Sequence, residues 1–261
     1  MNKLQFTIVG LCVLFFLALF FGANTKPANY AEIEKKRSLT AEITDINSLL
    51  IEAKPKLSKQ EATFILSLEK HVGEASSDSI KTAAYKNLAS KWYEYKRADI
   101  SGFYAEQVAE LEKTETAWSI AGTTFLLGAR QSDTDKIKRF CSSKAVTAFE
   151  NAISLNPENI NHKVNLATCF AENPPKENPM KGVLMLLDLN KQNPESVPVL
   201  VTLGRFGIQT GQFDKAVERL NKAIRLDNKN RQAHCLLAEA LNGLGEKEAA
   251  SIAQQNCAAL Q

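Results

Sequence analysis

The side chains that most often perform catalysis are sparse in this sequence. The chain has only three histidines, which lie far apart: His71, His162 and His234. It contains no G-x-S-x-G, P-loop, H-E-x-x-H or G-x-G-x-x-G motif. Two close carboxylate pairs, Glu42 with Asp45 and Glu110 with Glu112, are more typical of solvated surfaces than of an acid–base pair. The sequence therefore predicts a non-enzymatic protein with no cofactor and no metal site.

The cysteines are the second group of reactive side chains. There are five, without C-x-x-C or zinc-finger spacing: Cys12, Cys141, Cys169, Cys235 and Cys257. Two interpretations stay open for the last four. They form disulfides in an oxidising compartment, or they are small buried hydrophobic residues with free thiols.

The overall composition is that of a folded protein. Hydrophobic residues make up 44% and charged residues 23% of the 261 residues, and the net charge is +3. Because both signs of charge are mixed along the chain, no nucleic-acid-binding surface is indicated. We expect no small-molecule substrate.

A periodic pattern in 211–228 indicates which elements position these residues. Gly211 ends one helix, and Ala216, Leu220 and Ala223 then recur on one face of the next helix. Gly245 follows Gly211 after 34 residues and again precedes alanines. A glycine turn recurring between amphipathic helices indicates a helical repeat.

The pattern resembles the tetratricopeptide repeat (TPR) family, whose 34-residue helix–turn–helix unit has small residues at positions 8, 20 and 27. The unit 197–230 matches best, with Leu200, Leu203, Gly204, Ala216, Leu220 and Ala223. Its position 32 is Asn228, where the family often has proline. Four further units match less closely, namely 81–114 (degenerate), 115–159 (eleven extra residues), 160–196 (three extra residues) and 231–261. The resemblance implies an all-α solenoid, a right-handed superhelix of helical hairpins with a concave groove.

The resemblance also implies which residues line that groove. They occupy fixed positions of each first helix, namely Asn161, Val164, Thr168, Glu172, Val201, Arg205, Ile208, Gln209, Gln232, Glu239 and Asn242. This mixed polar and apolar set suits a peptide or a helix of a partner protein. The alternative is an ordinary solvated helix face.

One specific ligand is excluded on the same basis. Family members that grip the C-terminal carboxylate of cytosolic chaperones use lysine, asparagine and arginine at five positions of three repeats. In this chain those positions carry Ser119, Thr123, Asn165, Pro198 and Thr202, and only Asn165 matches.

Antiparallel stacking of the hairpins favours two cysteine pairs. Cys141 begins a second helix, and Cys169 lies near the end of the next first helix. Cys235 and Cys257 lie in the two helices of the last unit. Disulfides Cys141–Cys169 and Cys235–Cys257 are therefore one expectation, and four free thiols are the other.

Two insertions extend the array. A helix over 135–155 is expected to protrude, with Lys136, Lys138 and Arg139 on its outer side as a docking element or a contact for anionic lipid. The alternative is a solvated charge run. The loop 171–180 contains three prolines and either presents a binding surface or is a lengthened turn.

The N-terminal part of the chain has a different character. Residues 4–23 carry no charge and match the length of a bilayer span, so we expect residues 1–23 to form an uncleaved transmembrane or signal anchor, with a cleaved signal peptide as the alternative. A partly helical juxtamembrane linker, 24–57, and an accessory helix in 58–80 should follow. Ser58 and Glu61 form a capping-box pattern at the start of that helix.

These features together predict a membrane-anchored TPR scaffold that binds a protein or peptide. The arrangement resembles bacterial anchored repeat proteins, and this resemblance implies a role in cell-envelope assembly, secretion or cytochrome c maturation. The alternative is a structural accessory subunit of an oligomeric membrane complex. Basic residues after the anchor favour a cytoplasmic array. The short N-terminus and the paired cysteines favour an extracytoplasmic, periplasmic array, which is the orientation that we expect.

Overall fold

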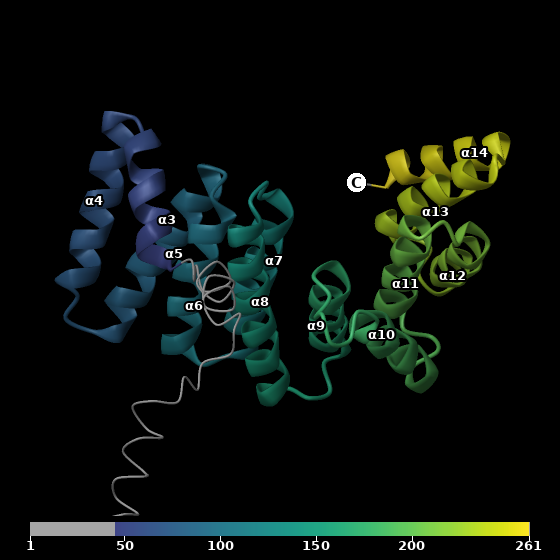
Figure 1. The fold of residues 1–261 in the computed structure, drawn as a ribbon, viewed down its shortest axis with the longest axis horizontal. Helices are drawn as coiled ribbons and strands as arrows, with labels where there is room; N and C mark the ends of the chain where they lie inside the picture. Colours follow the sequence, from purple (N-terminus) through teal and green to yellow (C-terminus); the bar gives the residue numbers. More distant parts are fainter. Residues whose placement is uncertain (1–44, 261) are drawn as a thin grey trace, which may run out of the picture. The chain divides into compact units, whose positions relative to one another are not determined.

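The computed structural model describes residues 45–260, and the predicted anchor and the first part of the linker lie outside these residues (Figure 1). Residues 45–260 contain twelve α-helices, one 3₁₀ turn and no strand. The helices are α3 (Ile46–Ala53), α4 (Lys59–Gly73), α5 (Asp78–Glu94), α6 (Ala98–Glu112), α7 (Glu115–Gln131), α8 (Asp135–Leu155), α9 (Ile160–Glu172), α10 (Lys181–Gln192), α11 (Val197–Gln209), α12 (Phe213–Leu226), α13 (Arg231–Leu244) and α14 (Lys247–Ala259). The 3₁₀ turn η1 spans Lys54–Lys56. Within this part of the chain, no helix is both long and apolar enough to cross a membrane.

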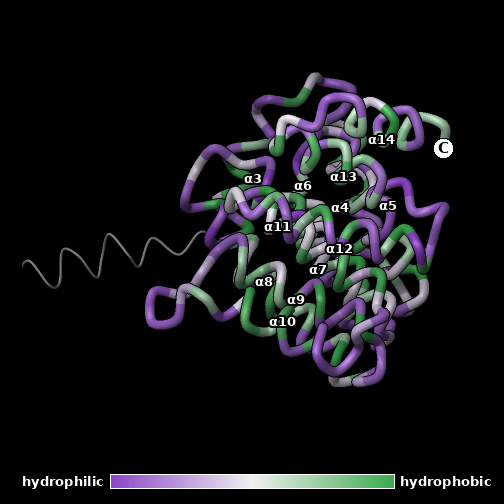
Figure 2. Tube along the Cα trace, turned by 90° about the vertical axis from the view of Figure 1, so that its right-hand side faces the viewer, coloured by the Kyte–Doolittle hydropathy of each residue, from purple (hydrophilic) through white to green (hydrophobic). Residues whose placement is uncertain are grey.

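From α4 onward, each helix packs against the next one in the chain. Each of the five predicted units contains one helix pair, from α5/α6 to α13/α14. The first helices of successive units also contact one another, α7 with α9, α9 with α11, and α11 with α13. Hydrophobic and hydrophilic residues are interleaved along the helices (Figure 2), as expected where each helix buries one face. The described residues therefore form an all-helical, TPR-like solenoid.

The predicted glycine turns have the backbone geometry that only glycine adopts easily. Gly211 has a φ of 71° and Gly245 a φ of 81°. The N–H of Gln212 donates to the carbonyl of Gly207 at 2.8 Å, which closes the end of α11. Such a left-handed residue after the last helical turn satisfies carbonyls that the helix leaves free. The glycines therefore set the reversal between the two helices of a pair.

Small residues let the two helices of a pair approach closely. A Cβ atom added to Gly204 would lie 2.7 Å from Leu220, and one added to Gly122 would lie 2.9 Å from Phe149. In both pairs a glycine of the first helix faces a fully buried large side chain of the second helix. A Cβ atom on Gly182 would meet the backbone of α9. These contacts leave no room for a larger residue.

The N-terminal helices pack against the array. α4 begins at Ser58, whose side chain accepts from the N–H of Glu61 while the Glu61 side chain accepts from the N–H of Ser58. Leu49 of α3 and Ile65 of α4 are buried in one cluster with Trp92 of α5. The 46–56 part of the predicted linker is therefore folded and contributes to the core.

α8 has the predicted bounds but does not protrude as expected. Ile137 and Phe140, in its first two turns, pack against the hydrophobic cluster of α3–α6 and against that of α7–α9. Further along α8, the ammonium of Lys144 binds both oxygens of the buried Glu106 at 3.0 and 2.8 Å. The first turns of α8 therefore lie against the array, because Ile137 and Phe140 are partly buried on these two clusters.

The degenerate first unit has a lysine at the turn where the last two units have Gly211 and Gly245. Lys96 has a φ of 60°, and the N–H of Arg97 donates to the carbonyl of Trp92 at 2.9 Å, the same bond as in the Gly211 turn. We expect Lys96→Gly to stabilise the protein by about 1 kcal/mol, because a left-handed backbone is strained for a residue with a Cβ atom. Thermal unfolding of the variant measures this gain.

A matched control substitution should change the stability in the opposite direction. Gly211→Ala places a Cβ atom on the same backbone geometry, so it should lower the melting temperature, although no atom lies within 4 Å of that position. A loss of stability in Lys96→Gly would contradict the assignment of this turn.

Candidate functional site

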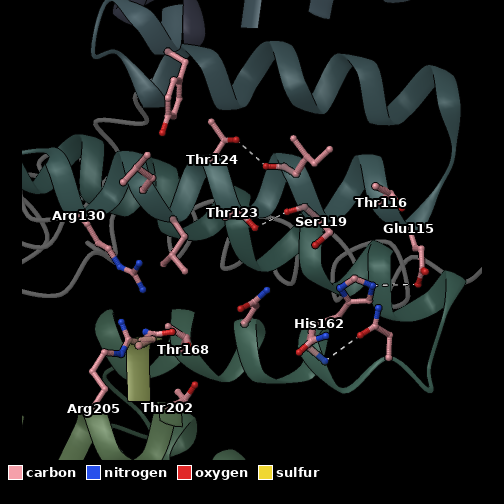
Figure 3. A pocket seen from close by; sticks show the side chains of 18 residues that line it. Glu115, Thr116, Ser119, Thr123, Thr124, Arg130, His162, Thr168, Thr202 and Arg205 are labelled. Atoms are coloured by element: carbon pink, nitrogen blue, oxygen red, sulfur yellow. Dashed lines mark hydrogen bonds and ion pairs between the residues drawn. The ribbon is translucent and has the colours of Figure 1, made fainter. Parts of the chain in front are cut away.

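A hollow of about 760 Å³ lies along the first helices of successive units (Figure 3). Side chains from α7, α9 and α11 make most of its wall. Tyr93 of α5 and Gln232 of α13 complete it. The hollow therefore spans successive units.

Helical spacing explains why α7 presents polar side chains here. Thr116, Ser119 and Thr123 follow one another at three or four residues and so share one face. The opposite face buries Ala121 and Phe125 in the core. The face that α7 turns to the hollow is therefore free to carry hydroxyl groups.

Several of these hydroxyls are already used as donors. The hydroxyl of Thr123 donates to the carbonyl of Ser119 at 2.7 Å, and that of Thr124 to the carbonyl of Ile120 at 2.8 Å. Thr202 of α11 donates to the carbonyl of Pro198 in the same way. Their oxygens keep acceptor lone pairs for N–H groups of a ligand. The amide of Asn165 adds both a donor and an acceptor to the wall.

Two large apolar side chains interrupt this polar wall. Ile120 is 55% exposed and Tyr93 is 53% exposed. Both line the hollow, together with Leu127. An exposed aromatic side chain beside an aliphatic one provides an anchor for an apolar side chain of a partner.

Charged groups lie at two places in the wall. Nε2 of the buried His162 lies 3.2 Å from a carboxylate oxygen of Glu115. Glu172, at the end of α9, accepts two hydrogen bonds from Arg130, at 2.8 and 2.7 Å, and one from Arg205, at 3.1 Å. The hydrogen bonds to Glu172 raise the pKa of Arg130. Burial lowers the pKa of Arg205, and the charge of Glu172 opposes that shift.

The structure divides the predicted groove residues into three groups. Four line the hollow, namely Asn161, Thr168, Arg205 and Gln232, and Glu172 holds the two arginines beside it. Gln209, Glu239 and Asn242 are exposed outside that wall. Val164, Val201 and Ile208 are instead buried, at 4%, 4% and 9% exposure. They cannot present a binding surface, because neighbouring first helices approach closely and cover them.

The sequence prediction did not include the α7 wall. Ser119 and Thr123 occupy the groove-lining positions of the unit 115–159, so the rule applied to later units would have included them. They entered the prediction only as positions that fail to match the chaperone-binding pattern. Tyr93 occupies such a position in the degenerate unit 81–114, which the prediction also left out, whereas Arg130 lies outside those positions and could not be found in this way.

The cysteines adopt one of the two predicted pairs. Cys235 of α13 and Cys257 of α14 form a disulfide, with Cα atoms 4.9 Å apart. Cys141 and Cys169 are free and buried, so the expected second disulfide is not formed. Cys141 lies near Asp99 and Arg97, whereas Cys169 lies near Glu172 and Arg130. The two thiols therefore face different neighbours, although both belong to one cluster.

A second hollow lies on another part of the described surface. This hollow of about 700 Å³ lies between α8 and the proline-containing loop after α9, lined among others by Lys138, Arg139 and Lys176. No group of three or more His, Cys, Asp or Glu side chains within residues 45–260 could hold a metal ion.

Comparison with known proteins supports the repeat assignment for one part of the chain. Residues 208–245, from the end of α11 to the end of α13, match the family model described as TPR repeat. This stretch contains the glycine-to-glycine period that the sequence shows most clearly. The chain matches no curated protein by sequence.

Several solved structures resemble the fold at low identity. MamA from Desulfovibrio magneticus RS-1 is 16% identical over 69% of this chain and 94% of its own, with a TM-score of 0.42. MamA AMB-1 is 17% identical over 70% of this chain and 92% of its own, with a TM-score of 0.37. YrrB, described as a TPR protein with an unusual peptide-binding site, is 17% identical over 74% of this chain and 92% of its own, with a TM-score of 0.38.

The disulfide should stabilise the last helix pair. Because it closes a loop over a sequence separation of 22 residues, its loss should cost about 3 kcal/mol. We expect Cys257→Ser to lower the melting temperature of the oxidised protein. Dithiothreitol should lower that of the wild type but leave the variant unchanged.

Thiol counting provides the control. Burial raises the pKa of Cys141 and of Cys169 to about 12, so neither thiol should react with iodoacetamide at pH 8 until the protein unfolds. Rapid alkylation of Cys235 and Cys257 in the untreated, folded protein would contradict the assigned disulfide.

Proposed function

We propose that this protein is a non-enzymatic scaffold that binds a peptide segment of a partner protein in the hollow across α7, α9, α11 and α13. The observation that carries the proposal is the composition of the wall. Acceptor hydroxyls and amides surround two exposed apolar side chains, and both kinds of group belong to helices that the core holds rigidly. An extended peptide offers backbone N–H groups to the acceptor hydroxyls and amides, and apolar side chains to the two exposed apolar residues.

We further propose that the scaffold is attached to a membrane through residues 1–23 and acts in envelope assembly, secretion or cytochrome c maturation. The uncharged stretch 4–23 supports the attachment. The Cys235–Cys257 disulfide supports an extracytoplasmic array, since structural disulfides persist in oxidising compartments. A structural subunit that docks through α8 is the less favoured alternative, because the first turns of α8 are packed against the array.

Selection of peptides on the full-length protein tests the binding function. A random-peptide display library should yield binders that Ile120→Glu weakens about tenfold or more, because a charge replaces an apolar anchor in the hollow. Fluorescence anisotropy with the selected peptides measures the change.

Ile252→Glu is the matched control. Ile252 on α14 is 60% exposed, close to the 55% of Ile120, but does not line the hollow. Equal losses in both variants, or no selected peptide at all, would overturn the proposal.

A further inference from the structure

We propose that the hollow recognises a carboxylate of its peptide through Arg130 and Arg205. This inference rests on the proposed function and adds the chemistry of the ligand. The two guanidinium groups belong to different units and both point toward the same end of the hollow (Figure 3). The carboxylate belongs to an Asp or Glu side chain or to the C-terminus of the peptide.

The charges at the arginine end of the hollow do not balance. Two guanidinium groups share one carboxylate, that of Glu172, and within residues 45–260 no other carboxylate lies in salt-bridge distance of either. This end of the wall therefore carries one positive charge in excess. The side chain of Arg205 is only 22% exposed, so water screens that charge poorly. An incoming carboxylate would compensate it.

The two arginines also have hydrogen-bond donors that Glu172 does not use. Each guanidinium has five N–H groups. Arg130 uses its Nε and Nη2 groups on Glu172, and Arg205 uses only Nη1. Arg205 thus keeps most of its donors, including the planar edge that binds a carboxylate through two parallel hydrogen bonds. Glu172 restrains both side chains, which lowers the entropic cost of binding.

The arginines share the hollow with other side chains that a peptide would contact. Thr202, which is half-buried, lies three residues before Arg205 and lines the hollow, whereas Thr168, also in the wall, is only 3% exposed. The apolar side chains of Tyr93, Ile120 and Leu127 line the same hollow. A peptide that places its carboxylate on the arginines would therefore also have apolar and hydroxyl contacts. Arg130 and Arg205 themselves do not lie at the five chaperone-binding positions, of which only Asn165 carries the matching residue.

The test uses peptides selected on the full-length protein. Most should contain an acidic residue or require a free C-terminus, and Arg205→Gln should weaken them about tenfold. Glu-to-Gln changes in the peptide and amidation of its C-terminus, measured separately, identify which carboxylate is bound. Arg219→Gln is the control, because Arg219 is also partly buried and donates to a carbonyl, that of Leu203, outside the hollow.

Glu172→Gln separates recognition from a structural role. Loss of this carboxylate should lower the melting temperature but tighten binding of acidic peptides several-fold, because the arginines lose their internal partner. A purely structural network would weaken binding in both variants. Two results would overturn this inference but not the proposed function. The selected peptides could show no preference for acidic residues, or they could bind Arg205→Gln and the wild type with equal affinity. Failure to select any peptide would overturn it together with the proposed function.

Discussion

The structure depends on the close approach of helices at small residues. Gly204 lies against Leu220 and Gly122 against Phe149 so tightly that a single added methyl group would clash. Each helix pair buries one face of each helix in this way, and neighbouring pairs bury the remaining apolar positions. Since no pair can cover all of its apolar surface alone, the array is stable only as a stack.

The same constraint creates the hollow. Because the first helices pack closely against one another, side chains between them, such as Val164 and Val201, are buried and cannot contact a ligand. The face of the first helices that lines the hollow stays partly accessible. Along that face lie hydroxyls, amides and two exposed apolar groups, and our proposal of peptide binding rests on this combination.

Charged groups are distributed unevenly along the hollow. A buried His–Glu contact lies in one part of the wall, and two arginines around a single glutamate lie in another. Excess charge held by short hydrogen bonds in a sheltered place contributes more to specificity than the same charge on an open surface. The disulfide between α13 and α14 then strengthens the packing of these two helices.

The sequence by itself determined the local and periodic features. Glycine at a left-handed turn, the Ser58–Glu61 cap and the bounds of α8 follow from short-range chemistry, and the repeat follows from periodic apolar faces. The part of the groove at Asn161, Thr168, Arg205 and Gln232 was accessible because it lies at fixed repeat positions.

Only the tertiary structure decided the contacts between residues distant in sequence. The pairing of Arg130 with Glu172 joins residues 42 apart, and the choice of one cysteine pair over the other depends on which neighbours each thiol faces. The burial of Ile137 depends on the packing of α6 against α8. Such features are set by the relative placement of whole helices, which depends on the summed packing of many side chains, and no short stretch of sequence encodes it.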